Sequence, residues 1–200
     1  DAPDKLRPRV LMAGSEAGFF IHDIHGRQLA HDPIGHAQSM AVANLLPERP
    51  GLEIMVNTYW GPAGITAVFD HEGNRLHEFE PMPYACLLQP VNWRPLRDGE
   101  TPADLILLST HTRQGGLIDG RGERLVMFPD DGHPVLCSDA RDIDGDGVDE
   151  VLTWDHHEIW IYKPDHPPAG RDKSNYPDRN PWFNDSNYRA QISLPPKRHA

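Results

Sequence analysis

Short stretches of alternating hydrophobic and polar residues run through most of this chain, and turn-forming residues interrupt them every few positions. Segments 52–57 and 64–70 are rich in β-branched and aromatic residues and are bounded by glycine, asparagine or aspartate. This pattern is typical of short strands joined by tight turns. The 20 prolines and 17 glycines suit such turns and disfavour long helices. We therefore expect an all-β chain.

The strand pattern repeats with a period of about fifty residues. Asn44, Asn92 and Asp142 stand at equivalent places, each at the end of the first strand of a unit. Each complete unit is expected to hold four short strands, and four-stranded units at this period are typical of β-propeller blades. A β-sandwich has equally short strands and is the alternative, but the repeat favours the propeller.

The repeat divides the chain into successive segments. The expected blades are 9–33, which lacks a first strand, then 34–81, 82–130 and 131–165, followed by a tail at 166–200. Stretch 187–194 of the tail alternates like a strand and could help to close the ring. About three and a half blades cannot close by themselves, because propellers use roughly four to eight. We expect the missing blades to come from a longer chain or from a second chain.

The clearest chemical motif is the stretch 142–150, which reads DIDGDGVDE. Alternating carboxylates in a glycine-containing loop supply the oxygen ligands that Ca²⁺ prefers. An acidic turn that binds no ion is the alternative. The expected ligands are the side chains of Asp142, Asp144, Asp146 and Glu150 and the carbonyl of Val148.

An EF-hand fits this loop poorly, because it needs flanking helices and a glutamate at its twelfth position. Thr153 stands at that position, and the residues that follow are strand-like. The equivalent loops after Asn44 and Asn92 lack the alternating acids. One competent loop among the units indicates that the ion is structural.

The formal charge of −11 argues against a nucleic-acid partner, because nucleic-acid-binding proteins carry basic patches. It also disfavours binding to an anionic membrane surface. No apolar run approaches the roughly 20 residues that a membrane-spanning helix needs.

Three stretches carry a resemblance to known proteins. The acidic loop is similar to the calcium loops of integrin-type (FG-GAP) repeat propellers. The sequences GHAQS from Gly35, PGLEI from Pro50 and NPWFNDSNYRAQISLP from Asn180 resemble rhamnogalacturonan lyase-like propellers, a group that includes ulvan lyases. The resemblance covers most of the chain and implies the C-terminal half of a longer polysaccharide lyase. It also implies an acidic polysaccharide substrate with rhamnose and uronic acid, and a secreted or periplasmic protein.

Candidate catalytic residues follow from the propeller geometry, in which the innermost strands of all blades begin at the rim of one central funnel. His36, Tyr84 and His133 stand at these positions, the last with an offset of one residue. A histidine or tyrosine can act as base or acid when its pKa is tuned. We expect His36 to be the base and Tyr84 the acid or a partner of the base, with His133 in the same set. A structural, hydrogen-bonded histidine is the alternative at each position.

The loops between second and third strands are expected to open on the same face. Arg113 could neutralise a sugar carboxylate as a bidentate partner. Aromatic rings can stack on sugars. The expected substrate-binding residues are Tyr59, Trp60 and His111.

Two other functions fit the sequence. A non-catalytic propeller could bind glycan or protein, because a fold does not determine a function. A glycoside hydrolase is less compatible, because it usually needs two carboxylates beside the scissile bond. On the expected funnel face, Asp155 is the only carboxylate that the sequence places.

Overall fold

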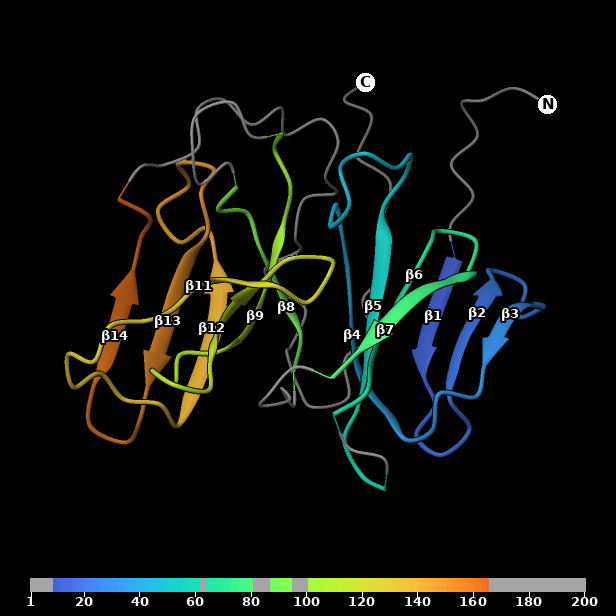
Figure 1. Ribbon diagram of the computed structural model, residues 1–200, viewed down its shortest axis with the longest axis horizontal. Helices are drawn as coiled ribbons and strands as arrows, with labels where there is room; N and C mark the ends of the chain where they lie inside the picture. The colour runs from blue at the N-terminus through green and yellow to red at the C-terminus, as the bar shows by residue number, and fades with distance from the viewer. Residues whose placement is uncertain (1–8, 62–63, 81–86, 95–100, 166–200) are drawn as a thin grey trace.

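The computed structural model describes residues 9–61, 64–80, 87–94 and 101–165. These residues form four antiparallel sheets and no helix, so the expectation of an all-β chain is confirmed (Figure 1). Since the described part contains no helix, it holds none that could cross a membrane. Tyr84 and the tail 166–200, for which a catalytic role and a closing strand were expected, lie outside the described residues.

Each sheet consists of strands that follow one another along the chain. Sheet 1 contains β1 (Arg9–Ala13), β2 (Phe19–Asp23) and β3 (Gln28–Asp32). Sheet 2 contains β4 (Ala37–Ala43), β5 (Glu53–Thr58), β6 (Thr66–Phe69) and β7 (Arg75–Phe79). Sheet 3 contains β8 (Gln89–Val91), β9 (Leu105–Ser109), β10 (Gly116–Ile118) and β11 (Arg124–Val126). Sheet 4 contains β12 (Cys137–Arg141), β13 (Glu150–Trp154) and β14 (Ile159–Tyr162).

The hydrophobic core lies between consecutive sheets. Phe19 of sheet 1 packs on Phe69 of sheet 2, with ring centroids 4.9 Å apart and both side chains fully buried. Val68 and Ile106 belong to a second cluster, between sheets 2 and 3, and a third cluster joins sheets 3 and 4. Burying one large apolar side chain contributes about 1.5–3 kcal/mol. Strands β5 and β6 are buried along their whole length, because sheet 2 is covered on both faces.

The sheets are arranged side by side in chain order, from β1–β3 (blue in Figure 1) to β12–β14 (orange). Strand β4 contacts β8, and β8 contacts β12, so the first strands of sheets 2, 3 and 4 lie next to one another. In Figure 1 the described residues that follow these three strands lie at one end of the sheets, the loop end. The turns that follow β5, β9 and β13 lie at the opposite end, the turn end.

The same kind of tight turn follows β2 in sheet 1, β6 in sheet 2 and β10 in sheet 3. An aspartate Oδ1 accepts hydrogen bonds of 2.9 Å from the backbone amides two and four residues further on. The residue three positions after each aspartate is a glycine with φ of 83°, 92° or 83°. Residues other than glycine adopt this conformation only with strain. The aspartates are Asp23, Asp70 and Asp119, and the glycines are Gly26, Gly73 and Gly122.

A recurring polar contact ties the loop of one sheet to the next sheet. The backbone amide of Asn44 donates to Asp104 Oδ2 at 2.9 Å, and the backbone amide of Asp104 donates back to the backbone carbonyl of Asn44 at 2.7 Å. The Asn92 amide donates to Asp149 Oδ2 at 2.9 Å, and the Asp149 amide donates to Asn92 Oδ1 at 2.8 Å. Asp104 and Asp149 are buried. These contacts hold the loop ends of sheets 2, 3 and 4 in a fixed relation.

Candidate functional site

The acidic loop between β12 and β13 brings three carboxylates together. Ligand oxygens of Asp142, Asp144 and Asp146 lie within 4.8 Å of one another, and all three residues are exposed. Gly145 and Gly147 have φ of 81° and 93° and let the backbone turn sharply around this cluster. Amides of the loop donate inward; for example, Gly147 N donates to Asp142 Oδ2 at 3.0 Å. The loop is therefore closed around its own acidic side chains.

Glu150 adds a buried carboxylate to the same loop. It is the first residue of β13 and only 2% exposed. Its Oε2 accepts a hydrogen bond from the Ile143 amide at 2.6 Å, and its Oε1 lies 2.6 Å from Lys163 Nζ. Lys163 Nζ also pairs with Asp144, and it lies 3.4 Å from Asp146 Oδ2. The Lys163 hydrogen bond holds the pKa of Asp144 below its ordinary value.

This donor set fits Ca²⁺. It consists of carboxylate oxygens in a flexible glycine-containing loop, whereas zinc sites use mainly histidine and cysteine. Val148 N donates to Asp146 Oδ1 at 2.8 Å, which places Val148 on the same loop. Binding of an ion, and the Val148 carbonyl as a ligand, stay predictions.

Removing Ca²⁺ with a chelator should lower the melting temperature, because an ion that binds only the folded state stabilises it. At free Ca²⁺ of about 100 times Kd the gain is about 2.7 kcal/mol, or roughly 5–11 °C for a chain of this size. Differential scanning fluorimetry with and without chelator measures the shift. Asp146→Asn should shrink the shift, and Glu158→Gln, an exposed carboxylate outside the loop, should leave it unchanged. An identical melt in both conditions would contradict the metal centre.

His36 lies at the turn end, beside Glu16. Its Nδ1 is 2.8 Å from Glu16 Oε1, and its side chain is 17% exposed. Ala37 N donates to the Ser15 carbonyl at 3.0 Å, which fixes the Glu16 loop against the start of β4. Ser15 has a φ of 52°, in the left-handed region that residues other than glycine rarely adopt. When Nδ1–H donates to the Glu16 carboxylate, the free lone pair of the imidazole is on Nε2, as a general base requires.

Tyr59 and Trp60 lie next to His36. Tyr59 N donates to the His36 carbonyl at 3.2 Å. The two aromatic rings meet edge to face with centroids 5.2 Å apart, and Trp60 is 62% exposed. The exposed Trp60 indole offers a large apolar surface one residue beyond the backbone contact between Tyr59 and His36. The structure thus brings together three of the residues selected from the sequence.

His133 has a different environment. Its side chain is 1% exposed, Nδ1 lies 2.6 Å from Asp131 Oδ1, and Nε2 donates to the Thr110 carbonyl at 2.7 Å. The hydroxyl of Tyr162 donates to Asp131 Oδ2 at 2.9 Å. The His133 hydrogen bond lowers the pKa of Asp131, so this carboxylate is ionised at neutral pH and accepts from Nδ1–H. Burial and the Asp131 contact raise the pKa of Tyr162.

Both nitrogens of the His133 ring are therefore engaged in hydrogen bonds, with Asp131 and with the Thr110 carbonyl, so neither faces a substrate. Phe128 and Trp160 pack around the ring. In this arrangement His133 links the residues before β12 to the end of β9.

His111 and Arg113 lie on the loop between β9 and β10, also at the turn end. His111 Nδ1 accepts hydrogen bonds from the amides of Arg113 at 3.2 Å and Gln114 at 3.1 Å, so the ring shapes the loop. Arg113 is exposed, and its carbonyl accepts a hydrogen bond from Arg124. Asp155 Oδ1 accepts from the amides of the turn that follows it, at 2.7 Å for His157.

The sequence reasoning missed Glu16, Asp131 and Lys163. Glu16 and Asp131 are exposed acids in irregular segments, and nothing in their spacing distinguishes them from solvated charges. Lys163 could have been noticed, because it directly follows β14, where the equivalent residue of the other sheets is an aspartate.

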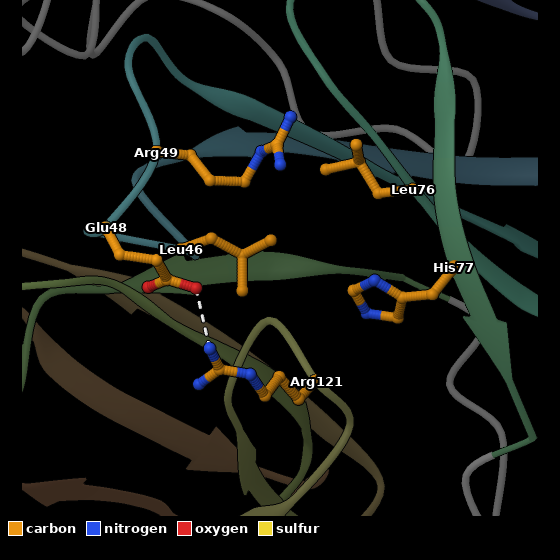
Figure 2. A pocket seen from close by; sticks show the side chains of 6 residues that line it. All are labelled: Leu46, Glu48, Arg49, Leu76, His77 and Arg121. Carbon is orange, nitrogen blue, oxygen red and sulfur yellow. Dashed lines mark hydrogen bonds and ion pairs between the residues drawn. The ribbon is translucent and has the colours of Figure 1, made fainter.

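An open cleft of about 450 Å³ lies at the loop end between sheets 2 and 3 (Figure 2). Arg121 Nη2 donates to Glu48 Oε1 at 2.6 Å across it, and His77 Nε2 donates to the Gly120 carbonyl at 2.8 Å. Arg49 extends along the upper wall in Figure 2, toward Leu76. None of the residues selected from the sequence lines this cleft.

Comparison with protein-family models, with curated proteins and with solved structures found no significant match for this chain.

Proposed function

We propose that this chain is part of a calcium-stabilised polysaccharide lyase, which cleaves a glycan containing rhamnose and uronic acid by β-elimination. The observation that carries the proposal is the Glu16–His36 pair, whose backbone contacts the segment of the half-buried Tyr59 and the exposed Trp60. A carboxylate that orients a histidine, next to a surface suited to sugar, is the minimal arrangement for abstracting a proton from a bound glycan.

We further propose that the sheets are successive blades of a β-propeller. Face-to-face cores between consecutive sheets, adjacent first strands and the repeated aspartate turns support this arrangement. Terminal sheets carry exposed apolar residues at alternate positions, Val10 and Met12 on β1 and Ile159 and Ile161 on β14. Further blades, from the same longer chain or another chain, would cover these surfaces.

In the proposed reaction His36 Nε2 takes the C5 proton of the uronate. The electron pair of the C5–H bond forms the C4–C5 double bond, and the C4–O bond breaks, with a proton delivered to the leaving oxygen. Tyr84 is the proposed acid. Arg113 is the proposed partner of the uronate carboxylate, whose neutralisation makes the C5 proton more acidic. We also propose a secreted or periplasmic location, because the proposed substrate is an extracellular acidic polysaccharide.

The second candidate is a non-catalytic module that binds glycan or protein. The surroundings of His133 favour this second candidate, because the ring is buried and hydrogen-bonded through both nitrogens.

Incubating the protein with ulvan, rhamnogalacturonan and gum arabic separates the two candidates. Release of unsaturated uronate, followed by its ultraviolet absorbance, supports the lyase. Glycan binding without this product supports the binding module. Neither binding nor product on any of the three glycans contradicts both.

Trp60→Ala should weaken glycan binding about tenfold, because loss of one exposed aromatic contact removes roughly 1–1.5 kcal/mol. Isothermal titration or affinity electrophoresis measures the change. Ile24→Ala is the matched control, since Ile24 is 60% exposed and Trp60 is 62% exposed, and Ile24 lies at the loop end. Equal weakening by both variants would contradict a specific surface at Trp60.

A further inference from the structure

Lys163 breaks a pattern that the other sheets share. An aspartate ends β2 or directly follows β6 and β10, and it closes a tight turn through its own side chain. The residue directly after β14 is Lys163. Among the described residues, sheet 4 is also the sheet that carries the cluster of three loop carboxylates. A cation thus replaces an acid at the place where an acidic loop is within reach.

The Lys163 ammonium lies among the carboxylates expected to bind the metal. It pairs with Asp144, lies 3.4 Å from Asp146 Oδ2 and lies 2.6 Å from Glu150 Oε1. Glu150 Oε1 is fully buried and accepts no hydrogen bond of normal geometry among the described residues. A buried carboxylate oxygen without such a bond is costly unless a cation lies beside it. In this structure that cation is the ammonium of Lys163.

A divalent ion bound by the same oxygens would lie within a few ångströms of this ammonium. Two cations so close repel each other strongly at the edge of a protein. The Lys163 side chain is 45% exposed and has a flexible four-carbon stem, so it can withdraw into solvent. Ion and ammonium therefore exclude each other from the loop.

We propose that Lys163 is a built-in competitor of the divalent cation: its ammonium fills the acidic loop without the ion and leaves it when the ion binds. This proposal rests on the metal centre proposed above. Two consequences follow. The lysine stabilises the ion-free loop. It also weakens Ca²⁺ binding, because the apparent Kd is the intrinsic Kd divided by the fraction of ion-free molecules whose loop is free of the ammonium.

Lys163→Met tests the proposal, because methionine keeps much of the stem and removes the charge. Calcium affinity is measured by isothermal titration of the full chain at constant ionic strength. If the ammonium fills about nine-tenths of ion-free loops, Lys163→Met should bind Ca²⁺ about tenfold more tightly. Arg27→Met is the control, since it removes one positive charge at an exposed turn of sheet 1 and should leave the affinity unchanged.

Thermal melts give a second readout. Without Ca²⁺, Lys163→Met should melt below the wild type, and saturating Ca²⁺ should remove this deficit. A deficit of equal size in both conditions would show a purely structural lysine and overturn the proposal. Lys163→Gln, measured in the same way, provides a second neutral variant should the methionine variant fold poorly.

The outcomes distinguish this proposal from those it depends on. Calcium binding by the wild type with equal or weaker binding by Lys163→Met overturns the competitor and leaves the metal centre standing. No calcium binding by either protein overturns both. Lyase activity is measured separately, so its absence leaves the result for Lys163 unaffected.

Discussion

Glu53→Ala should lower the free energy of unfolding by roughly 3 kcal/mol, measured by urea denaturation at neutral pH. Glu53 begins β5 and is 1% exposed. Its Oε2 accepts hydrogen bonds from the amides of Leu45 at 3.0 Å and Leu46 at 2.9 Å. Alanine would leave both amides without this acceptor, and each unsatisfied buried donor costs about 1–3 kcal/mol.

Glu53→Gln and Glu72→Ala are the controls. Glutamine keeps a carbonyl oxygen for the two amides, so its effect should be clearly smaller than that of alanine. Glu72 is exposed, and its truncation should stay within about 0.5 kcal/mol of the wild type. A Glu53→Ala protein as stable as the Glu72→Ala protein would show that the loop does not depend on Glu53.

The pH dependence of the same variants follows from the Glu53 carboxyl. Burial raises its pKa above the ordinary value of 4.5, although hydrogen bonds from Leu46 and Leu45 act in the opposite direction. The folded state therefore holds the proton more tightly than the unfolded state. This contribution to stability is fully present below about pH 4.5 and is lost as the pH rises through the folded-state pKa. As the pH rises through the folded-state pKa of Glu53, the stability of Glu53→Gln relative to the wild type should therefore increase.

Glu53 also explains how a loop can keep its shape without alternating acids. In sheet 2 one buried carboxylate binds the amides of the loop after β4. In sheet 4 Glu150 begins β13 in the same way and accepts from Ile143. The difference is the three added aspartates and the cation that they attract. The acidic loop thus adds a charge cluster to a loop design already present in sheet 2.

The all-β character could be predicted from the sequence because it depends on local properties. Alternation within a strand and the aspartate and glycine of each tight turn act over a few residues. The turn at Asp70 needs only Gly73 and the amides of neighbouring residues. The three clustered loop aspartates could also be selected from the sequence, because their spacing sets their separation.

Contacts between distant segments could not be predicted in this way. Glu16 reaches His36 across 20 residues, and Lys163 reaches Asp144 across 19. His133 illustrates the same limit, because a histidine before a strand can face solvent or, as here, fill a buried site. Which of these occurs depends on Asp131 and Tyr162, whose approach requires the finished packing of sheets 3 and 4.

His36→Ala should lower the rate of unsaturated-uronate release by about 10²–10⁴-fold, the usual contribution of a general base. The effect should fall on kcat, because Trp60 and Tyr59 would still bind the glycan. Initial rates on whichever uronate glycan is cleaved measure the loss. Glu16→Gln should cause a smaller decrease, since glutamine can still accept from Nδ1–H but lacks the charge that stabilises a protonated ring.

The control for this prediction is His25→Ala, which removes an exposed histidine from a loop-end turn of sheet 1 and should leave the rate unchanged. His36→Ala with wild-type kcat would exclude His36 as the base. A loss of glycan affinity equal to the loss of rate would instead assign His36 to binding. Only a large loss of kcat with retained binding, together with a partial loss in Glu16→Gln, fits a histidine that is oriented by Glu16 and abstracts the proton.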